Sequence, residues 1–324
     1  LAPAMRTDFS VAGTFTPSNV NDISAVHSVG PLRLPKRGHE ARAPEIETVY
    51  VMASPAYSFV SSSGVKEIAS FGGRAAYIGK VADDEFGRIF AHDIRAFGVA
   101  FETAPTKGGA PTARSLILVT PDGERTMNTY LGVSSLLQPS DIDEATVASG
   151  AVLYMEGYLY DRPAAKDAFR HAAAIAHANG RKVSLTLSDS FCVDRHRADF
   201  RALVTDEVDI LFGNEDELLS LYEVSSLDEA VAAVRRDCHL AVITLGAKGC
   251  MVISADGVVT APAEPVAHVL DTTGAGDLFA AGFLYGFTRD LPMVECARLG
   301  AIAAAEVISH VGPRPLVELR TFLP

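Results

Sequence analysis

The sequence predicts an α/β sandwich, with a mainly parallel central sheet, helices on both faces and a small β lid. From Gly72 onward, apolar strand-like runs alternate with helical segments over short links, which is the pattern of parallel sheets covered by helices. Two early strand runs are instead joined by a short Asp-Gly turn, which is typical of an antiparallel hairpin. With 324 residues, of which 48% are hydrophobic, the chain can bury a full core.

The elements are assigned along the chain from the period of the apolar residues. In the first part, only residues 48–53 and 59–60 look like strand material. The strands expected after it are residues 75–78, 113–120, 125–131, 151–155, 182–187, 208–212, 240–244, 250–254 and 265–270. The helices expected are residues 84–97, 163–179, 215–222 and 227–237, followed by a buried helix that begins at a Gly-Ala-Gly turn.

The chain divides into two parts at the sequence level. Residues 1–70 form a divergent N-terminal segment without sustained periodicity, and residues 71–324 form one α/β domain. A lid hairpin is expected at about residues 101–131, with its turn at Pro121-Asp122-Gly123-Glu124. Residues 188–192, which include Cys192, are expected to form a loop.

Composition excludes several classes of protein. A net charge of −12 argues against sequence-independent binding of nucleic acid, which needs a basic face. No apolar run reaches the length needed to cross a membrane, and the N-terminus lacks a signal-peptide pattern, so a cytoplasmic protein is expected. The four cysteines show neither zinc-site spacing nor a disulfide framework, so free thiols are expected.

The most informative stretch is residues 271–284, DTTGAGDLFAAGFL. Its turn, Gly274-Ala275-Gly276, stands where a helix begins, and there the first backbone N–H groups lack partners inside the helix. Glycines allow an anion to approach those groups closely. Asp277 adds a carboxylate beside them. This combination suits transfer of a phosphoryl group to a hydroxyl, with the N–H groups holding the moving charge and the carboxylate accepting the proton.

A glycine-rich turn before a helix also has other interpretations. Such a turn often only starts a helix, with an Asp as its cap. A dinucleotide fingerprint does not fit, because Phe279 occupies the position of the third glycine. A Walker loop does not fit either, because the candidate at residues 73–80 is one residue too long and is followed by Val81.

The whole string closely resembles the C-terminal signature of the ribokinase-like (PfkB) carbohydrate and nucleoside kinases. In that family, the Asp that corresponds to Asp277 is the catalytic base, and the residues that correspond to Gly274, Ala275 and Gly276 form the anion hole. The resemblance covers roughly residues 72–315. It implies the ribokinase-like three-layer sandwich with a small β lid, and ATP with Mg²⁺ as cofactors.

Two further motifs match the family and also have simpler interpretations. Asn214 and Glu217 match its Asn-x-x-Glu motif, which implies a metal and phosphate role with Mg²⁺ held through water; alone, they indicate a helix cap with an acidic first turn. Thr244, Gly246 and Gly249 match the nucleotide-binding loop; alone, they indicate a common hairpin link.

The resemblance assigns the remaining candidates. Arg125 matches a lid position that reaches towards the substrate, although a lone Arg is commonly a surface charge. Ala301 lies in the region that walls the purine of ATP. A K⁺ ion is held beside the turn in related kinases, and here Asp271 and Thr273 supply suitable oxygens, although Asp271 also suits a turn cap.

Matches at residues 123–132, 155–160, 185–197, 208–217 and 291–315 indicate the adenosine-kinase-like branch. The function this implies is ATP-dependent phosphorylation of the 5′ hydroxyl of a nucleoside, with adenosine as the expected acceptor. A ribokinase- or fructokinase-like sugar kinase is the alternative. A non-catalytic ATP-binding regulatory protein is another, because residues 1–70 lack the family's N-terminal Asp and its Gly-Gly-x-x-x-Asn motif. The expected partners are small molecules, without nucleic acid or membrane, for a monomer or homodimer.

Overall fold

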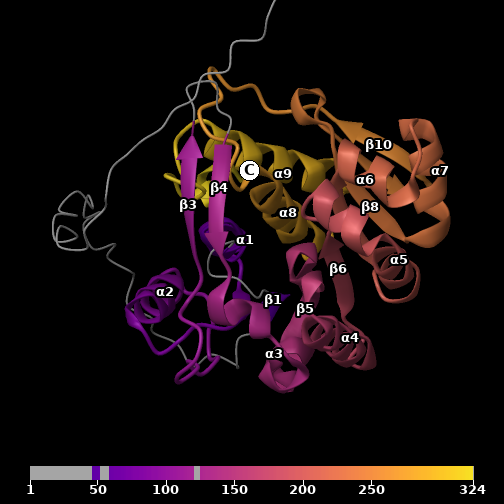
Figure 1. The fold of residues 1–324 in the computed structure, drawn as a ribbon. Coiled ribbons are helices and arrows are strands. Elements are labelled where there is room, and N and C mark those ends of the chain that lie inside the picture. Colours follow the sequence, from indigo (N-terminus) through magenta and orange to yellow (C-terminus); the bar gives the residue numbers. More distant parts are fainter. Residues whose placement is uncertain (1–45, 52–57, 120–124, 324) are drawn as a thin grey trace, which may run out of the picture. The chain divides into compact units, whose positions relative to one another are not determined.

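The computed structural model of the protein describes residues 46–51, 58–119 and 125–323. These residues form an eight-stranded sheet and a separate two-stranded lid (Figure 1). The strand order in the sheet is β10-β9-β8-β7-β6-β5-β1-β2. Neighbours from β8 to β2 pair in parallel, whereas β9 and β10 are antiparallel additions at one edge. The predicted α/β fold with a mainly parallel sheet is therefore confirmed.

The strands of the sheet are short and mostly buried. They are β1 (Ile46–Val51), β2 (Ala75–Ile78), β5 (Gly150–Glu156), β6 (Lys182–Thr186), β7 (Ile210–Asn214), β8 (Leu240–Thr244), β9 (Cys250–Ser254) and β10 (Gly257–Ala261). In β5, side chains alternate between the two faces, so that Leu153 and Met155 enter one core while Val152 and Tyr154 enter the other. Continuous apolar strands are expected where both faces are covered.

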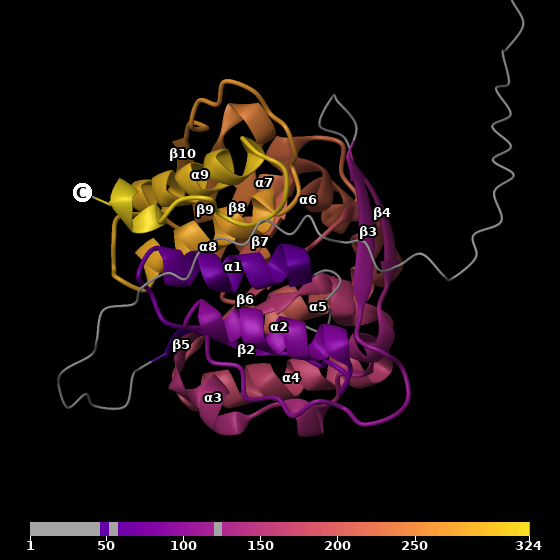
Figure 2. The ribbon, with the colours of Figure 1, turned by 90° about the vertical axis from the view of Figure 1, so that its left-hand side faces the viewer.

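Helices cover both faces of the sheet. One face carries α1 (Ser58–Ser70), α2 (Glu85–Ala96), α8 (Ala275–Phe287) and α9 (Met293–Ile308). Figure 2 shows these four helices on the side towards the viewer. The other face carries α3 (Glu144–Ser149), α4 (Pro163–Ala178), α5 (Ser190–Asp206), α6 (Glu215–Tyr222) and α7 (Leu227–Asp237).

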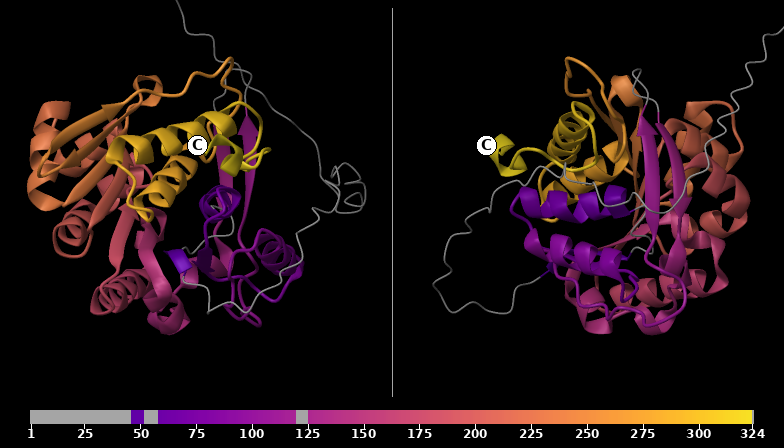
Figure 3. Two further views of the ribbon diagram at one scale, coloured as in Figure 1. Left: turned by 180° about the vertical axis from the view of Figure 1, so that it is seen from behind. Right: turned by 60° about the vertical axis from the view of Figure 1, so that its left-hand side comes forward.

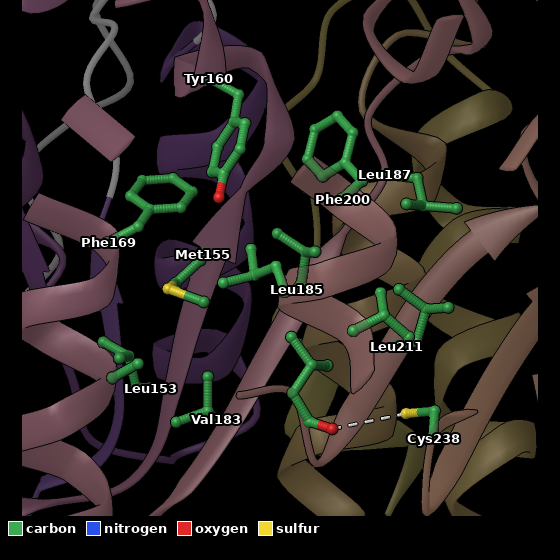
Figure 4. Close-up of a cluster of buried hydrophobic side chains, with 14 of the residues drawn as sticks. Leu153, Met155, Tyr160, Phe169, Val183, Leu185, Leu187, Phe200, Leu211 and Cys238 are labelled. Atoms are coloured by element: carbon green, nitrogen blue, oxygen red, sulfur yellow. Dashed lines mark hydrogen bonds between the residues drawn. The ribbon is translucent and has the colours of Figure 1, made fainter. Parts of the chain in front are cut away.

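The core on the α4–α7 face contains a group of aromatic rings. Tyr160 lies between Phe169 and Phe200, as Figure 4 shows, with ring centroids 5.7 Å and 4.8 Å away. All three side chains are fully buried. Burial of each such ring contributes about 1.5–3 kcal/mol to the free energy of unfolding, so this cluster fixes the segment that follows β5 against α4 and α5.

The lid is the predicted hairpin. Strands β3 (Arg114–Val119) and β4 (Arg125–Tyr130) pair in antiparallel register, from Arg114 opposite Tyr130 to Val119 opposite Arg125. Figure 3 shows the two strands standing apart from the main sheet. One lid face is open to solvent, with Leu116 74% and Leu118 63% exposed. The predicted turn at residues 121–124 lies outside the described residues, as do most of residues 1–70.

Two strand predictions are wrong. Residues 59–60 lie in helix α1, because packing of that helix against α8 outweighs the strand propensity of its apolar residues. Residues 265–270 form no strand. Pro265 cannot donate to a ladder, and Leu270 donates its N–H to the carbonyl of Ile308 instead, at 2.8 Å.

The loop expected at residues 188–192 is also wrong from Ser190 onward, where α5 begins. Asp189 caps this helix by accepting the N–H of Cys192 at 2.5 Å, an N-cap signal that the sequence contained. Strand β10 was not predicted; it pairs with β9 across a tight link at Gly257.

The four cysteines are buried free thiols, as expected. Among the described residues, the helices are all too short or too polar to pass through a bilayer.

Candidate active site

A cavity of about 120 Å³ opens at the carboxyl ends of β6, β7 and β8. Thr186, Asn214 and Thr244 line it from the ends of these strands, and residues 274–277 line it from the first turn of α8. Ligands of open parallel sheets gather at this edge. The α8 turn and the strand ends therefore form one candidate site, although they are far apart in sequence (Figure 1).

The turn before α8 has the backbone geometry that its glycines permit. Gly274 is the N-cap residue with φ 85°, in the left-handed region, where a side chain is disfavoured. Gly276 is exposed, and no described atom lies within 4 Å of the place that a Cβ would take. The N–H of Ala275 already makes a long bond of 3.3 Å to the Thr272 carbonyl. The approach to the helix start is therefore most open at Gly276.

Asp277 lines the same cavity from the first turn of α8, where it is half-buried. It lies near a second carboxyl group, Glu217 of α6, across the cavity. Burial raises the pKa of Glu217 to about 7, although hydrogen bonding to Asn214 opposes this, and the charges of Asp189, Asp216 and Asp277 raise it further. The cavity thus concentrates negative charge, which a divalent cation would offset.

Asn214 and Glu217 form a reciprocal capping box at the start of α6. The N–H of Glu217 donates to Asn214 Oδ1 at 2.8 Å, and the backbone N–H of Asn214 donates to Glu217 Oε2 at 3.0 Å. Asn214 Nδ2 also donates to Oε1 at 2.7 Å. The simpler interpretation, a helix cap, describes these contacts. The residues described contain no group of three or more metal-ligating side chains, so a cation here would keep most of its water.

The loop after β8 is a tight turn that contains the short 3₁₀ helix Gly246–Lys248. Gly246 and Gly249 both have positive φ, 59° and 93°. A Cβ on Gly249 would lie 2.0 Å from the carbonyl oxygen of Ala261, so only glycine fits. Of the three predicted loop residues, Thr244 lines the cavity, and Gly246 and Gly249 lie beyond its described lining.

The remaining predicted residues lie outside the cavity lining that the structure describes. Ala301 is buried in α9 within the core shared with α8. Asp271 accepts the N–H groups of Thr273 and Gly312, both at 2.9 Å. Thr273 is buried, and its hydroxyl has no hydrogen-bond partner among the described atoms. The side chain of Arg125 falls outside the described residues, so its role stays a prediction.

Sequence reasoning missed Tyr158 and Ser188, which also line the cavity. Tyr158 follows β5 in the 3₁₀ helix Gly157–Asp161, and its hydroxyl donates to the Ser188 carbonyl at 2.9 Å. Ser188 has φ 73°, a conformation that costs a non-glycine residue about 1–3 kcal/mol. The one available signal was position, because both residues follow strands whose carboxyl ends form this edge.

A second cavity, of about 600 Å³, adjoins the first at Tyr158, which lines both. Its walls come from the end of β4 and the segment after it, including Tyr130, and from Glu156 and Asp161 at the end of β5. The volume is within the range of small-molecule sites. The lid base and the sheet edge thus enclose a space beside the α8 turn.

Comparison with known proteins shows the family of the chain. Residues 65–319 match the family model described as pfkB family carbohydrate kinase. The solved adenosine kinase of Sinorhizobium meliloti is 44% identical, with a TM-score of 0.82, over 86% of this chain and 98% of that one. Fructokinase-1 of Oryza sativa is 31% identical over 69% of this chain and 71% of its own length. The 5-dehydro-2-deoxygluconokinase of Geobacillus kaustophilus is 26% identical over 87% of each chain.

The family match covers more than half of the chain, and it includes the lid, the strand ends of the sheet and the α8 turn. The relatives are named as kinases of sugars or nucleosides. The chain is therefore a kinase that belongs to the pfkB family of carbohydrate kinases.

Proposed function

We propose that this kinase transfers the γ-phosphoryl group of ATP, with Mg²⁺, to the 5′ hydroxyl of a nucleoside, with adenosine as the first candidate. The observation that carries the proposal is the pair of adjoining cavities at the sheet edge. The smaller one places Asp277 and the open α8 turn together, and the larger one offers a space under the lid for the acceptor.

The lining of the larger cavity supports a nucleoside acceptor. Tyr130 and Tyr158 provide aromatic surface for a flat base. Glu156 and Asp161 provide carboxylates that accept hydrogen bonds from ribose hydroxyls. The 44% identity with an adenosine kinase supports the same acceptor.

In the proposed reaction, Asp277 accepts the proton of the attacking hydroxyl. The N–H groups at the start of α8, foremost that of Gly276, hold the negative charge of the transferred group. Glu217 and Asn214 would hold hydrated Mg²⁺, which would supply positive charge to neutralise the phosphates. Thr244, which lines the smaller cavity, belongs to the proposed phosphate side. Gly246, Gly249 and Ala301 belong to the proposed adenine side, and Arg125 to the lid.

A sugar kinase is the second candidate, because two of the relatives above are named as a fructokinase and a 5-dehydro-2-deoxygluconokinase. A panel of nucleosides and sugars, each assayed with ATP for acceptor-dependent ADP formation, separates the two. We expect the highest kcat/KM with adenosine. Higher kcat/KM with fructose or another sugar would replace the first proposal with the second. ATP binding without turnover for any acceptor would instead favour the regulatory alternative.

We also propose a K⁺ site beside the α8 turn. Asp271 is buried and tied to two backbone N–H groups, and the buried hydroxyl of Thr273 has no described partner. A cation there would fix the turn without touching the acceptor. Turnover should rise several-fold when K⁺ replaces N-methylglucamine at constant ionic strength. Equal rates in both salts would remove the K⁺ site and leave the role of Asp277 intact.

A further inference from the structure

Helix α1 contains a buried carboxyl group that has no role in the site described above. Glu67 is 0% exposed, and among the described atoms both of its carboxyl oxygens lack a hydrogen-bond partner. Burial raises its pKa well above the ordinary value, and the nearby charge of Glu306 adds to this. Burial therefore favours the protonated form of Glu67. An ionised carboxylate in this position would be strongly unfavourable.

Glu306, on the last turn of α9, is the neighbour of Glu67. One carboxyl oxygen, Oε1, accepts the N–H of Leu316 at 2.8 Å and lies 3.3 Å from His310 Nε2. The other oxygen, Oε2, is buried without a partner. The charge of Glu306 acts on Glu67, and the helices that carry them, α1 and α9, share an apolar cluster with α8 that includes Phe71 and Ala303.

Glu306 holds the segment that follows α9, residues 309–316, which we name the C-terminal loop. This loop lies directly behind the α8 turn. Gly312 donates its N–H to Asp271 at 2.9 Å. Pro313 Cβ lies 3.0 Å from the place that a Cβ on Gly274 would take. Any shift of the loop would therefore be transmitted to the turn.

A second charged anchor holds the same loop. Arg314 pairs with Asp93 of α2 at 2.6 Å, and Lys66 of α1 pairs with the same Asp93 oxygen at 2.6 Å. The C-terminal loop is thus attached to α1, α2 and α9 at once. One of these attachments, from the Leu316 N–H to the Glu306 carboxylate, differs from the others. The charge of that carboxylate acts on a second, buried carboxyl group, that of Glu67.

We propose that Glu306 is a positioning residue for the α8 turn, and that the proton on Glu67 keeps Glu306 in place. Loss of that proton puts two negative charges in one buried space. Movement of Glu306 relieves the repulsion but releases the N–H of Leu316 and loosens the C-terminal loop. The link to turnover rests on the proposed function of the α8 turn, whereas the proton on Glu67 does not.

Other charged groups near Glu67 do not replace this role. The charged or titratable groups on the surrounding elements are Lys66 on α1, Asp93 on α2, Tyr77 on β2, Tyr285 and Arg289 on α8, His310 and Arg314 in the C-terminal loop, and Arg320 after it. Glu306 supplies the charge that acts on the pKa of Glu67. Burial, followed by the charge of Arg314, lowers the pKa of Lys66 to about 8. The effect of Lys66 on the free energy of unfolding therefore becomes more favourable as pH rises, whereas that of Glu67 becomes less favourable.

The first test measures the melting temperature against pH for wild type and Glu67→Gln. The folded pKa of Glu67 lies above its unfolded value, so its contribution to stability is present below about pH 4.5 and is lost as pH rises towards the folded pKa. Gln cannot ionise. The melting temperature of the variant relative to wild type should therefore rise by at least about 3 °C between pH 5 and pH 8. The apolar variant Glu67→Met should show the same trend.

A difference in melting temperature from wild type that does not change between pH 5 and 8, in both variants, would overturn the proton on Glu67. The second test measures kcat and the KM for ATP in Glu306→Ala and Glu306→Gln. We expect Ala to lower kcat by about tenfold or more with little change in KM, and Gln to restore most of it, because its amide oxygen still accepts the Leu316 N–H. Glu295→Ala is the control, on the first turn of the same helix, where Glu295 is half-buried and pairs with Arg298 far from the C-terminal loop.

Unchanged kcat in Glu306→Ala would overturn the positioning role. Equal loss in the Ala and Gln variants would also overturn it. If the proposed role of Asp277 failed independently, the melting curves would still decide whether Glu67 is protonated in the folded protein, so the two failures are distinguishable.

Discussion

At the scale of single residues, Asp277 carries the central prediction. Asp277→Asn keeps the size of the side chain and removes its basicity, so turnover should fall by roughly 10²-fold or more while ATP still binds. Steady-state kinetics and ATP titration by calorimetry measure the two effects. Asp216→Asn is the matched control, because Asp216 is exposed on the first turn of α6 and does not line the cavity. Wild-type turnover in Asp277→Asn would remove the proposed base.

Glu217 gives a prediction on pH and Mg²⁺. Its pKa is raised to about 7, and Mg²⁺ favours the ionised form. The apparent dissociation constant for Mg²⁺ should therefore rise as pH falls from 8 to 6, by up to about tenfold per pH unit below that pKa. Glu217→Gln should lose this part of the slope, and the comparison cancels protonation of ATP itself. An identical slope in the variant would exclude Glu217 from the Mg²⁺ site.

The residues of the site were predictable to different degrees. Asp277, Asn214 and Thr244 stand in motifs with a local sequence pattern, and the structure brings them to one cavity. Tyr158 and Ser188 have no such pattern, because their position depends on how β5 and β6 pair and on a left-handed serine. Glu67 and Glu306 lie on α1 and α9, near opposite ends of the chain, so no local sequence pattern predicts that their charges interact.

At the scale of elements, the turn after β8 gives a prediction on stability. A Cβ on Gly249 would lie 2.0 Å from a backbone oxygen, whereas Gly246 has open space around it. Gly249→Ala should lower the free energy of unfolding by about 3 kcal/mol or more, and Gly246→Ala by about 1–2 kcal/mol. Urea denaturation measures both. Equal losses of unfolding free energy in the two variants would mean that positive φ alone, rather than the close approach of the Ala261 oxygen, determines the loss.

Most elements of the α/β domain were predictable because their apolar period agrees with their final burial, as in α6 and α7. Several elements were not, and two of them show why. Helix α1 is decided by tertiary packing on α8, against the propensity of its first apolar residues. The segment 265–270 has strand-like composition, but Leu270 donates its N–H to the carbonyl of Ile308 at the end of α9. In both, contacts with distant residues outweigh local preference.

At the scale of the whole molecule, the net charge of −12 opposes the approach of an anionic nucleotide. Raising ionic strength from about 10 to 150 mM screens this repulsion. The kcat/KM for ATP, measured at saturating Mg²⁺ and constant K⁺, should rise by a few-fold, while kcat changes little. A fall in kcat/KM over the same range would show that local positive groups, rather than net charge, control the encounter.

The attachments of the C-terminal loop also have a consequence for the order of synthesis. Gly312 binds Asp271, 41 residues earlier, and Leu319 donates to the hydroxyl of Ser70, 249 residues earlier. A growing polypeptide can therefore form the sheet and α8 before these two contacts exist. The α8 turn gains its support from Gly312 only after residues 309–319 have been synthesised, so the sheet precedes the complete candidate site.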